Sequence, residues 1–203
     1  MKDSQLSKKS IEEDLRTLAS NIAKRTGKKV AKRLGERHIL TSKSSTTDLV
    51  TEIDEWSEKQ ITKYITSHRP NDEIICEEGT YIKGENNIRW FIDPIDGTTN
   101  FVYSHPGFSI SVGVEIDKET KVGAIYAPLL NELFSASSSH GTTCNGREVE
   151  VSKTNELSNA LIATGFSYKS EFRGTQAKNL VGILQGKRAP LQKSSFEFGE
   201  KVK

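Results

Sequence analysis

The sequence predicts an α+β fold built in layers, with a predominantly antiparallel sheet and two N-terminal helices. Apolar residues recur at helical spacing in two segments before residue 70, and short β-branched runs follow between residues 74 and 136. The chain has 203 residues, of which 34% are hydrophobic and 28% are charged, so it can bury one core.

Composition excludes several function classes. No apolar run is long enough to cross a membrane, and residues 1–10 are polar without a signal-peptide core, so we expect a cytoplasmic protein with no membrane partner. The net charge of +2 points to no class of partner. Cys76 and Cys144 are too few for a disulfide framework and lack metal-ligand spacing, so both are predicted to be buried thiols.

The first helix is predicted from a capping box, Ser10-Ile11-Glu12-Glu13, to a stop at Gly35. Its second half is basic, with Lys24, Arg25, Lys28, Lys29, Lys32, Arg33 and Arg37. Such a face can meet RNA or another acidic partner. No aromatic residue is interleaved for stacking on bases, so the sequence favours a solvated helix face.

A second amphipathic helix is predicted from Leu49, Ile53, Trp56, Ile61, Tyr64 and Ile65, ending at Arg69-Pro70. Asp54 falls within this helix beside Ile53, and can therefore face inward. The pattern by itself favours a solvated helix acid.

Two predicted strands end in acidic residues followed by glycine. The apolar run at residues 74–76 precedes Glu77 and Glu78, and the run at residues 90–92 precedes Asp93 and Asp96. Successive strand residues point to opposite faces, so one of the two glutamates can join a metal site and the other would be a surface acid or an ion-pair partner. Pro94 has no N–H group, and we expect the chain to leave the sheet there.

The segment after residue 92 predicts a phosphate site. Carboxylates and backbone carbonyls are the oxygen ligands that hard divalent cations prefer. Gly97 allows the backbone to approach a ligand, and N–H groups opening a helix at Thr98 would bind an anion. The alternative is an ordinary turn, because Asp-Pro and Asp-Gly are also common turn signals.

The strands predicted after this segment are antiparallel. They cover residues 108–116, 121–126 and 132–136, and a hairpin follows around Asn145-Gly146. A further strand at residues 161–166 and a helix at residues 175–184 complete the prediction.

The run from Asp93 to Phe101, Asp-Pro-Ile-Asp-Gly-Thr-Thr-Asn-Phe, resembles without a mismatch the signature of the inositol monophosphatase family of magnesium-dependent, lithium-sensitive phosphatases. Lys43, the run Asp48-Leu49-Val50-Thr51, Asp54 and Glu77 also match family positions, whereas Cys76 replaces the usual glycine. The resemblance spans roughly residues 11–184 and implies a layered α/β sandwich of the sugar-phosphatase type.

The resemblance assigns roles to these residues. One Mg²⁺ would be held by Glu77, Asp93 and the carbonyl of Ile95, and a second by Asp93, Asp96 and a later Asp. Glu77 and Thr98, the latter hydrogen-bonded to Asp54, would orient and activate the attacking water. The N–H groups of Gly97 and Thr98 would hold the phosphate beside Asp96, and Lys43 would steady the outer waters.

The implied activity is hydrolysis of a phosphate monoester, with inositol monophosphate as the first candidate and a homodimer as the assembly. Residues 1–186 are expected to form an incomplete domain of this family, and residues 187–203 a disordered or aberrant tail. A family motif, Trp-Asp-x-Ala-Ala, does not occur in this sequence, so the resemblance implies a second magnesium site that would lack one ligand. Two alternatives stay open: an impaired or non-catalytic protein that binds RNA or RNA polymerase and its elongation machinery, which is the weaker expectation, and a phosphatase for another sugar or polyol phosphate.

Overall fold

The computed structural model describes residues 2–36, 40–42, 49–156, 159–160, 165–167 and 170–185. It divides into two units, residues 1–150 and 151–203. The first contains α1 (Lys2–Ala31), β1 (Leu40–Ser42), β2 (Leu49–Thr51), α2 (Glu52–His68), β3 (Glu73–Cys76), β4 (Tyr81–Ile82), β5 (Ile88–Asp96), α3 (Thr98–Val102), β6 (Ser109–Ile116), β7 (Glu119–Ala127), β8 (Glu132–Ser137), β9 (Gly141–Cys144) and β10 (Arg147–Glu148). The second contains α4 (Ser170–Leu184).

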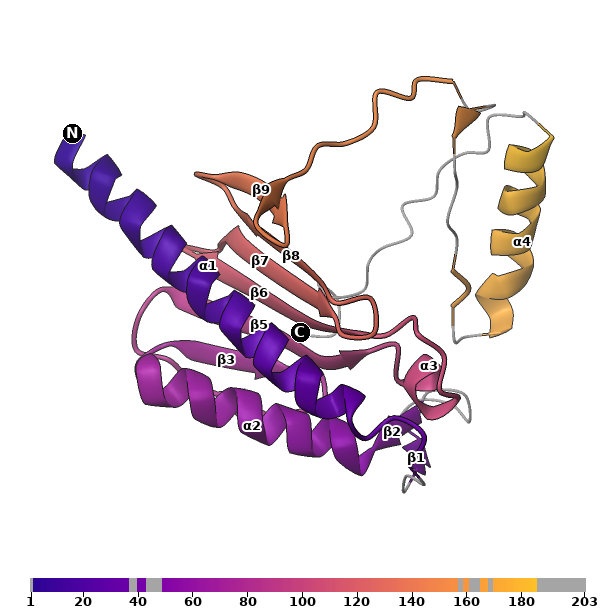
Figure 1. The fold of residues 1–203 in the computed structure, drawn as a ribbon, viewed down its shortest axis with the longest axis horizontal. Helices are drawn as coiled ribbons and strands as arrows, with labels where there is room; N and C mark the ends of the chain where they lie inside the picture. The colour runs from indigo at the N-terminus through magenta and orange to yellow at the C-terminus, as the bar shows by residue number, and fades with distance from the viewer. Residues whose placement is uncertain are drawn as a thin grey trace. The chain divides into compact units, whose positions relative to one another are not determined.

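The centre of the first unit is an eight-stranded sheet in the order β10-β9-β8-β7-β6-β5-β3-β4. β3 and β5 pair in parallel, and every other pairing described in this sheet is antiparallel. Helices α1 and α2 lie side by side across one face (Figure 1), α1 against β6, β7 and β8 and α2 against β5. The predicted α+β fold with a mostly antiparallel sheet is confirmed. No described helix has the length and apolar content to span a membrane.

Helix α1 buries a stripe at helical spacing, formed by Leu15, Ala19, Ile22, Ala23 and Val30. It approaches the sheet closely at Gly27, where a Cβ atom would lie 2.6 Å from the Tyr126 ring. The predicted start at Ser10 is wrong, because the helix begins at Lys2. No glycine or proline interrupts the preceding residues, so a potential capping box does not stop the helix from extending upstream.

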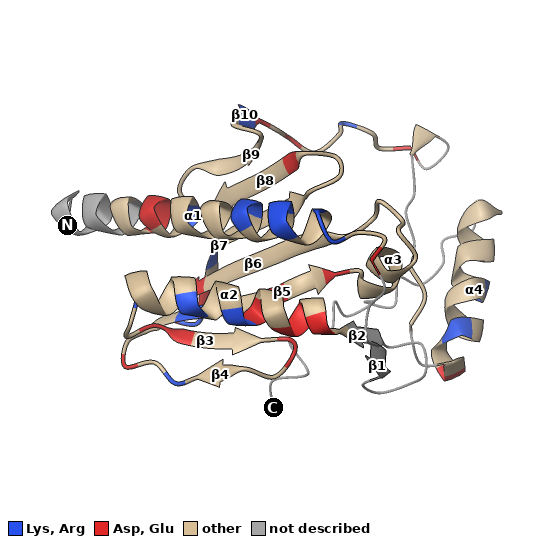
Figure 2. Cartoon of the chain, turned by 60° about the horizontal axis from the view of Figure 1, so that its bottom comes forward, with Lys and Arg blue, Asp and Glu red and all other residues tan. Residues whose placement is uncertain are grey.

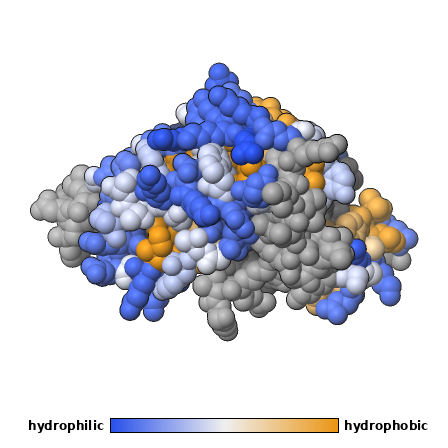
Figure 3. Space-filling view, turned by 90° about the horizontal axis from the view of Figure 1, so that it is seen from below, coloured by the Kyte–Doolittle hydropathy of each residue, from blue (hydrophilic) through white to orange (hydrophobic). Residues whose placement is uncertain are grey.

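Helix α2 starts three residues later than predicted because Leu49–Thr51 form β2. Thr51 is its N-cap, and Thr51 and Asp54 form a reciprocal capping box. Ile53, Ile61 and Ile65 face the core. Acidic residues gather in the first turns of α2, and basic residues in the C-terminal half of α1 (Figure 2). The described residues on the face seen in Figure 3 are mostly hydrophilic.

The strands at residues 108–136 occur as predicted to within two residues at each end. The hairpin is also present, with positive φ at Asn145 (50°) and Gly146 (79°), as a tight two-residue turn requires. The second face of the sheet is less covered: Ile125 on β7 and Phe134 on β8 pair across the strands and remain 45% and 39% exposed. The predicted strand at residues 161–166 lies largely outside the described residues, and α4 begins five residues before the predicted helix.

Strand β5 corrects the prediction that the chain leaves the sheet at Pro94. It continues to Asp96, with an irregularity in its pairing to β6 between Asp93 and Asp96. A proline is compatible with a strand at such a bulge, where no ladder hydrogen bond is required from its nitrogen.

Candidate active site

The parallel pairing of β3 and β5 brings two acid-bearing strand ends together. Cys76 lies opposite Ile92, and the Glu77 N–H group donates a hydrogen bond of 2.9 Å to the Ile92 carbonyl. Because parallel strands end at the same edge of a sheet, Glu77 follows β3 at the level where Asp93 occurs on β5. The sequence positions both residues near strand ends, and the sheet makes them neighbours.

Asp93 is a buried carboxyl group that lacks sufficient partners. The residue is 6% exposed, and its Oδ1 atom has no hydrogen-bond partner. Burial, the charge and side-chain hydrogen bond of Glu77, and the charges of Asp96 and Glu78 together raise the pKa of Asp93 to about 9. A bound cation would reverse this effect by favouring the charged carboxylate.

Asp96 lies at the more open end of β5. Burial and the charge of Glu77 raise the pKa of Asp96, while a hydrogen bond from Ser109 lowers it. Ser109 Oγ lies 3.3 Å from Asp96 Oδ2. Glu77 and Asp96 are exposed and Asp93 is buried, so the three acids form a group that is open to solvent on one side.

Asp54 faces inward and contacts the signature segment. It is fully buried in the first turn of α2, which excludes the solvated helix acid that the local pattern favours. Its Oδ2 atom accepts hydrogen bonds from Thr51 N (2.8 Å) and Thr51 Oγ1 (2.6 Å). The Thr98 hydroxyl lies 3.1 Å from Asp54 Oδ1 and 3.0 Å from the Ile95 carbonyl oxygen, so the contact implied by the resemblance is present.

Glu58 binds the loop that follows β3 and carries Glu77 and Glu78. The sequence did not predict this role for Glu58. This residue is 4% exposed and lies one helical turn after Asp54, on the same face of α2. Its carboxylate accepts hydrogen bonds from Glu78 N (2.9 Å) and Thr80 N (3.0 Å). The spacing of four residues from Asp54 was the available signal, but nothing in the local sequence indicated its acceptors.

Gly97 connects β5 to α3, and the backbone at this position leaves no room for a side chain. Its φ is 90°, and a Cβ atom there would lie 2.9 Å from the Gly107 carbonyl oxygen. The Phe101 N–H group donates to the Gly97 carbonyl at 3.1 Å, closing the first helical turn. The N–H groups of a first turn have no acceptor within their own helix, which is the property that the predicted phosphate contacts of Gly97 and Thr98 require.

A divalent cation fits the chemistry of this group, although its ligands are not arranged as a finished cage. Within the described residues, no set of three or more His, Cys, Asp or Glu side chains is placed so that it could hold a metal ion. The unpartnered Oδ1 atom of Asp93 and the mutual repulsion of Glu77, Asp93 and Asp96 are what a cation would relieve. The carbonyl of Ile95 keeps a second lone pair beside its bond from Thr98.

The remaining predicted residues have different outcomes. Lys43 and Asp48 lie outside the described residues. Cys76 is buried, and burial raises the pKa of its thiol well above the ordinary range. Cys144 is only half-buried on β9, because the edge hairpin leaves it partly open to solvent.

The amino-acid sequence is similar to those of known proteins over most of its length. A sequence model of the inositol monophosphatase family matches residues 11–199. The chain is 38% identical over 154 residues to a protein named Nus factor SuhB from Pasteurella multocida, and 37% identical over 172 residues to an inositol monophosphatase from Dictyostelium discoideum. These matches cover 75% and 80% of this chain but only 58% and 63% of the relatives, so the chain spans less than two thirds of their length.

Solved structures show the same likeness. The extragenic suppressor protein suhB from Bartonella henselae matches with a TM-score of 0.81 and 30% identity, over 85% of this chain and 67% of that one. An IMPase from Thermotoga maritima matches with a TM-score of 0.72 and 32% identity, over 86% and 66% of the two chains. Both the sequence match over nearly the whole chain and the shared fold lead to one conclusion: this chain belongs to the inositol monophosphatase family.

Proposed function

We propose that the protein hydrolyses a phosphate monoester with the help of Mg²⁺, and that inositol monophosphate is its first candidate substrate. The observation that carries the proposal is the buried Asp93 carboxyl group, whose Oδ1 atom has no partner and whose neighbours are Glu77 and Asp96. Family membership supports phosphatase chemistry, and one relative is named inositol monophosphatase. A cytoplasmic location and a homodimer belong to the same proposal.

The residues act by holding ligands and orienting water. Glu77, Asp93 and the Ile95 carbonyl are the proposed ligands of one Mg²⁺. Asp93 is shared with a second site, to which Asp96 is also a proposed ligand and which needs a further one. When bound, the metal supplies an acidified water and neutralises the phosphoryl oxygens. Glu77 and Thr98 orient that water, Asp54 fixes the Thr98 hydroxyl, and the N–H groups of Gly97 and Thr98 bind the phosphate. Lys43 is proposed to steady the outer waters.

Phosphate release from inositol 1-phosphate tests the proposal. We expect turnover by the 203-residue chain with Mg²⁺, loss of turnover with EDTA, and inhibition by lithium. A panel of other sugar and polyol phosphates, assayed in parallel, identifies the preferred ester. Folded protein that releases no phosphate from any of these esters in the presence of Mg²⁺ would refute the enzymatic proposal for this chain.

Thr98→Val tests the positioning role of the hydroxyl group. Valine keeps the branched shape but loses the donor to Asp54, so we expect a loss of about 1–2 kcal/mol in the free energy of unfolding. If Thr98 orients the water, kcat falls by about 100-fold or more with little change in KM. Thr98→Ser retains the hydroxyl group and should recover most of both quantities. Equal kcat values for the two variants would remove Thr98 from the proposed mechanism.

A second candidate function is a non-catalytic binding role. Two of the relatives described above carry the names Nus factor SuhB and extragenic suppressor protein suhB, which favours a partner in the transcription machinery. Purified RNA polymerase with its elongation factors, tested for co-migration with this chain, distinguishes this role from the phosphatase. Binding without turnover would favour this second function, and turnover without binding would favour the first.

A further inference from the structure

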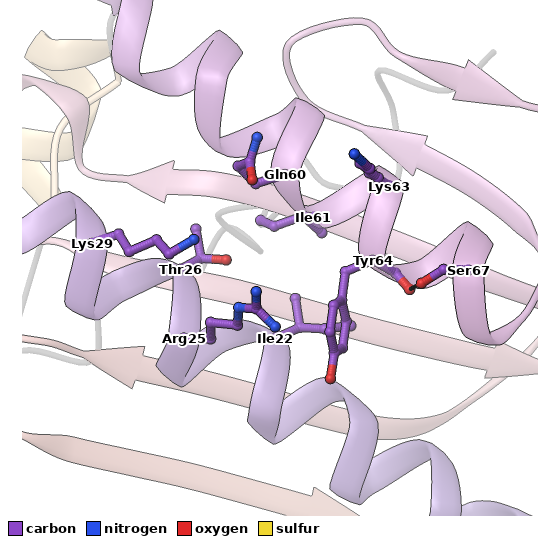
Figure 4. Close-up of a pocket in the computed structure, with 9 residues that line it drawn as sticks. All are labelled: Ile22, Arg25, Thr26, Lys29, Gln60, Ile61, Lys63, Tyr64 and Ser67. Atoms are coloured by element: carbon purple, nitrogen blue, oxygen red, sulfur yellow. Dashed lines mark hydrogen bonds between the residues drawn. The ribbon is translucent and has the colours of Figure 1, made fainter.

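A cavity of about 230 Å³ opens between α1 and α2, apart from the acidic group at the ends of β3 and β5. Figure 4 shows Arg25 and Lys29 on the α1 side of this cavity and Gln60 and Tyr64 on the α2 side. Lys63 adds a third cation at its rim. None of the nine residues that line the cavity carries a carboxylate.

Among the described residues, these three cations have no acidic partner, unlike several other basic residues of the fold. Carboxylates pair with Arg16, Arg33, Arg69, Arg89 and Lys121. In the part of the chain that the structure describes, no carboxylate lies within ion-pair distance of Arg25, Lys29 or Lys63. Concentrated positive charge without a counter-charge favours an anion at the same place.

Aromatic rings position two of these cations without neutralising them. The Arg25 guanidinium lies 5.1 Å from the centroid of the Tyr64 ring, and the Lys29 amino group lies 5.7 Å from that of Trp56. A cation over an aromatic face keeps its charge, and the edge of a guanidinium plane keeps its N–H donors. The aromatic residues that are missing from the sequence of α1 are therefore supplied by α2.

We propose that this cavity binds a small anion carrying two or more phosphate groups. Three cations match a multiply charged ligand, and Arg25 offers the planar donor pair that binds phosphate oxygens. The cavity is smaller than the roughly 300–1,000 Å³ typical of sites for drug-sized ligands, which limits the ligand to a compact molecule. Thr26 and Gln60 add polar groups to the lining.

The geometry favours a compact anion over a nucleic acid. Single-stranded nucleic acids gain affinity by stacking bases on aromatic faces. Tyr64 is contacted by Arg25 and by the His68 ring, whose centroid lies 4.4 Å away in a tilted arrangement, and Trp56 is contacted by Lys29. Each of these rings therefore already has a cation over one face, which leaves less aromatic surface for a base.

Isothermal titration calorimetry with inorganic pyrophosphate tests the proposal on the 203-residue chain. The titration is performed at low ionic strength with EDTA, so that no metal bridges the ligand to the acidic group. We expect saturable binding that weakens at least about tenfold in the double variant Arg25→Gln/Lys29→Gln, because two charge-assisted contacts are lost. Lys63→Gln should weaken binding by a smaller factor.

The matched control is Lys28→Gln/Lys32→Gln, which removes the same net charge from exposed positions of the same region that do not line the cavity. This control should change the affinity by less than about threefold, as expected for screened charges at a distance. Arg25→Lys keeps the charge and should retain part of the binding, which separates ligand loss from misfolding. Circular dichroism verifies that each variant is folded.

Three results would overturn the proposal. The first is no saturable binding to the wild-type chain, and the second is equal weakening of pyrophosphate binding by the two double variants. The third is binding of single-stranded RNA that Lys28→Gln/Lys32→Gln weakens as much as Arg25→Gln/Lys29→Gln does. The last result would assign the basic surface to nucleic acid.

The cavity contains none of the proposed phosphatase residues, so Arg25→Gln/Lys29→Gln should leave magnesium-dependent phosphate release unchanged. Failure of either proposal is thus recognisable without the other.

Discussion

Replacing Asp93 by Asn is expected to stabilise the metal-free protein while abolishing its response to Mg²⁺. Asp93 is buried with an unpartnered oxygen and beside the charges of Glu77 and Asp96, so its charged form is unfavourable without a cation. Asparagine removes the charge at nearly constant volume. We expect the free energy of unfolding in EDTA at neutral pH to rise by at least about 1 kcal/mol, the equivalent of roughly one pKa unit.

The dependence of stability on pH follows from the direction in which the pKa of Asp93 is shifted. The pKa of Asp93 rises from 3.8 in the unfolded reference to about 9 in the folded protein. The contribution of this group to stability is therefore fully present below pH 3.8 and is lost as the pH rises through about 9. In EDTA, the wild-type protein should lose stability over this range more steeply than Asp93→Asn. Thermal unfolding at a series of pH values measures both slopes.

Mg²⁺ should make the wild-type protein more stable than Asp93→Asn, the reverse of the order expected in EDTA. A cation bound by Asp93 displaces its proton and stabilises the folded state, so Mg²⁺ should raise the unfolding temperature of the wild type and not that of Asp93→Asn. Phosphate release should fall at least about 100-fold in the variant, because even residues that only support metal ligands cost 10–100-fold. If the variant is destabilised in EDTA and still responds to Mg²⁺, Asp93 is a structural acid.

Asp72→Asn provides the control for a buried carboxylate. Asp72 is 2% exposed, but it accepts hydrogen bonds from Arg69, Asn86 and the Trp90 indole. Neutralising this fully paired group should destabilise the protein by about 1–3 kcal/mol, opposite in sign to Asp93→Asn. The contrast would show that the expected gain at Asp93 comes from its unpartnered Oδ1 atom and its acidic neighbours and not from burial alone.

Glu58→Gln is expected to loosen the loop that carries Glu77. The carboxylate of Glu58 accepts from the Glu78 and Thr80 N–H groups, whereas a glutamine amide has only one acceptor oxygen. One backbone donor is then left facing an NH₂ group, which should reduce the free energy of unfolding by about 1–3 kcal/mol. Denaturant unfolding in EDTA measures this loss without any contribution from metal.

The same variant should weaken Mg²⁺ binding, because Glu77 immediately precedes the loop residues that Glu58 holds. We expect a loss of about 10–100-fold in magnesium affinity or phosphate release, as is usual for residues that orient metal ligands. Glu55→Gln removes an exposed carboxylate from the same helix and should change neither quantity. Normal magnesium affinity in a destabilised Glu58→Gln protein would show that Glu58 supports the fold and not the site.

Local patterns could predict the helices, the central strands and the acids at two strand ends, because these depend on periodicity and turn chemistry. The pairing of β3 with β5, which makes Glu77 and Asp93 neighbours, is a tertiary feature that neither strand encodes alone. The burial of Asp54 was ambiguous for the same reason: the local sequence does not show that Thr98 lies against it.

Other errors have identifiable causes. The start of α1 was misplaced because a capping box can also occur inside a continuing helix. The two-residue strand β4 was missed because it is short and held by its pairing with β3. The contacts of Arg25 and Lys29 with rings on α2 could not be seen from α1, since aromatic partners need not be close in the sequence.

Helix α2 contacts two separate segments through two carboxylates one turn apart: Asp54 binds Thr98 at the start of α3, and Glu58 binds Glu78 and Thr80 in the loop after β3. Local opening of this helix would therefore release both segments in a single cooperative step. We therefore expect the acidic strand ends and the first half of α2 to open as one unit, so that order at one segment is thermodynamically linked to order at the other.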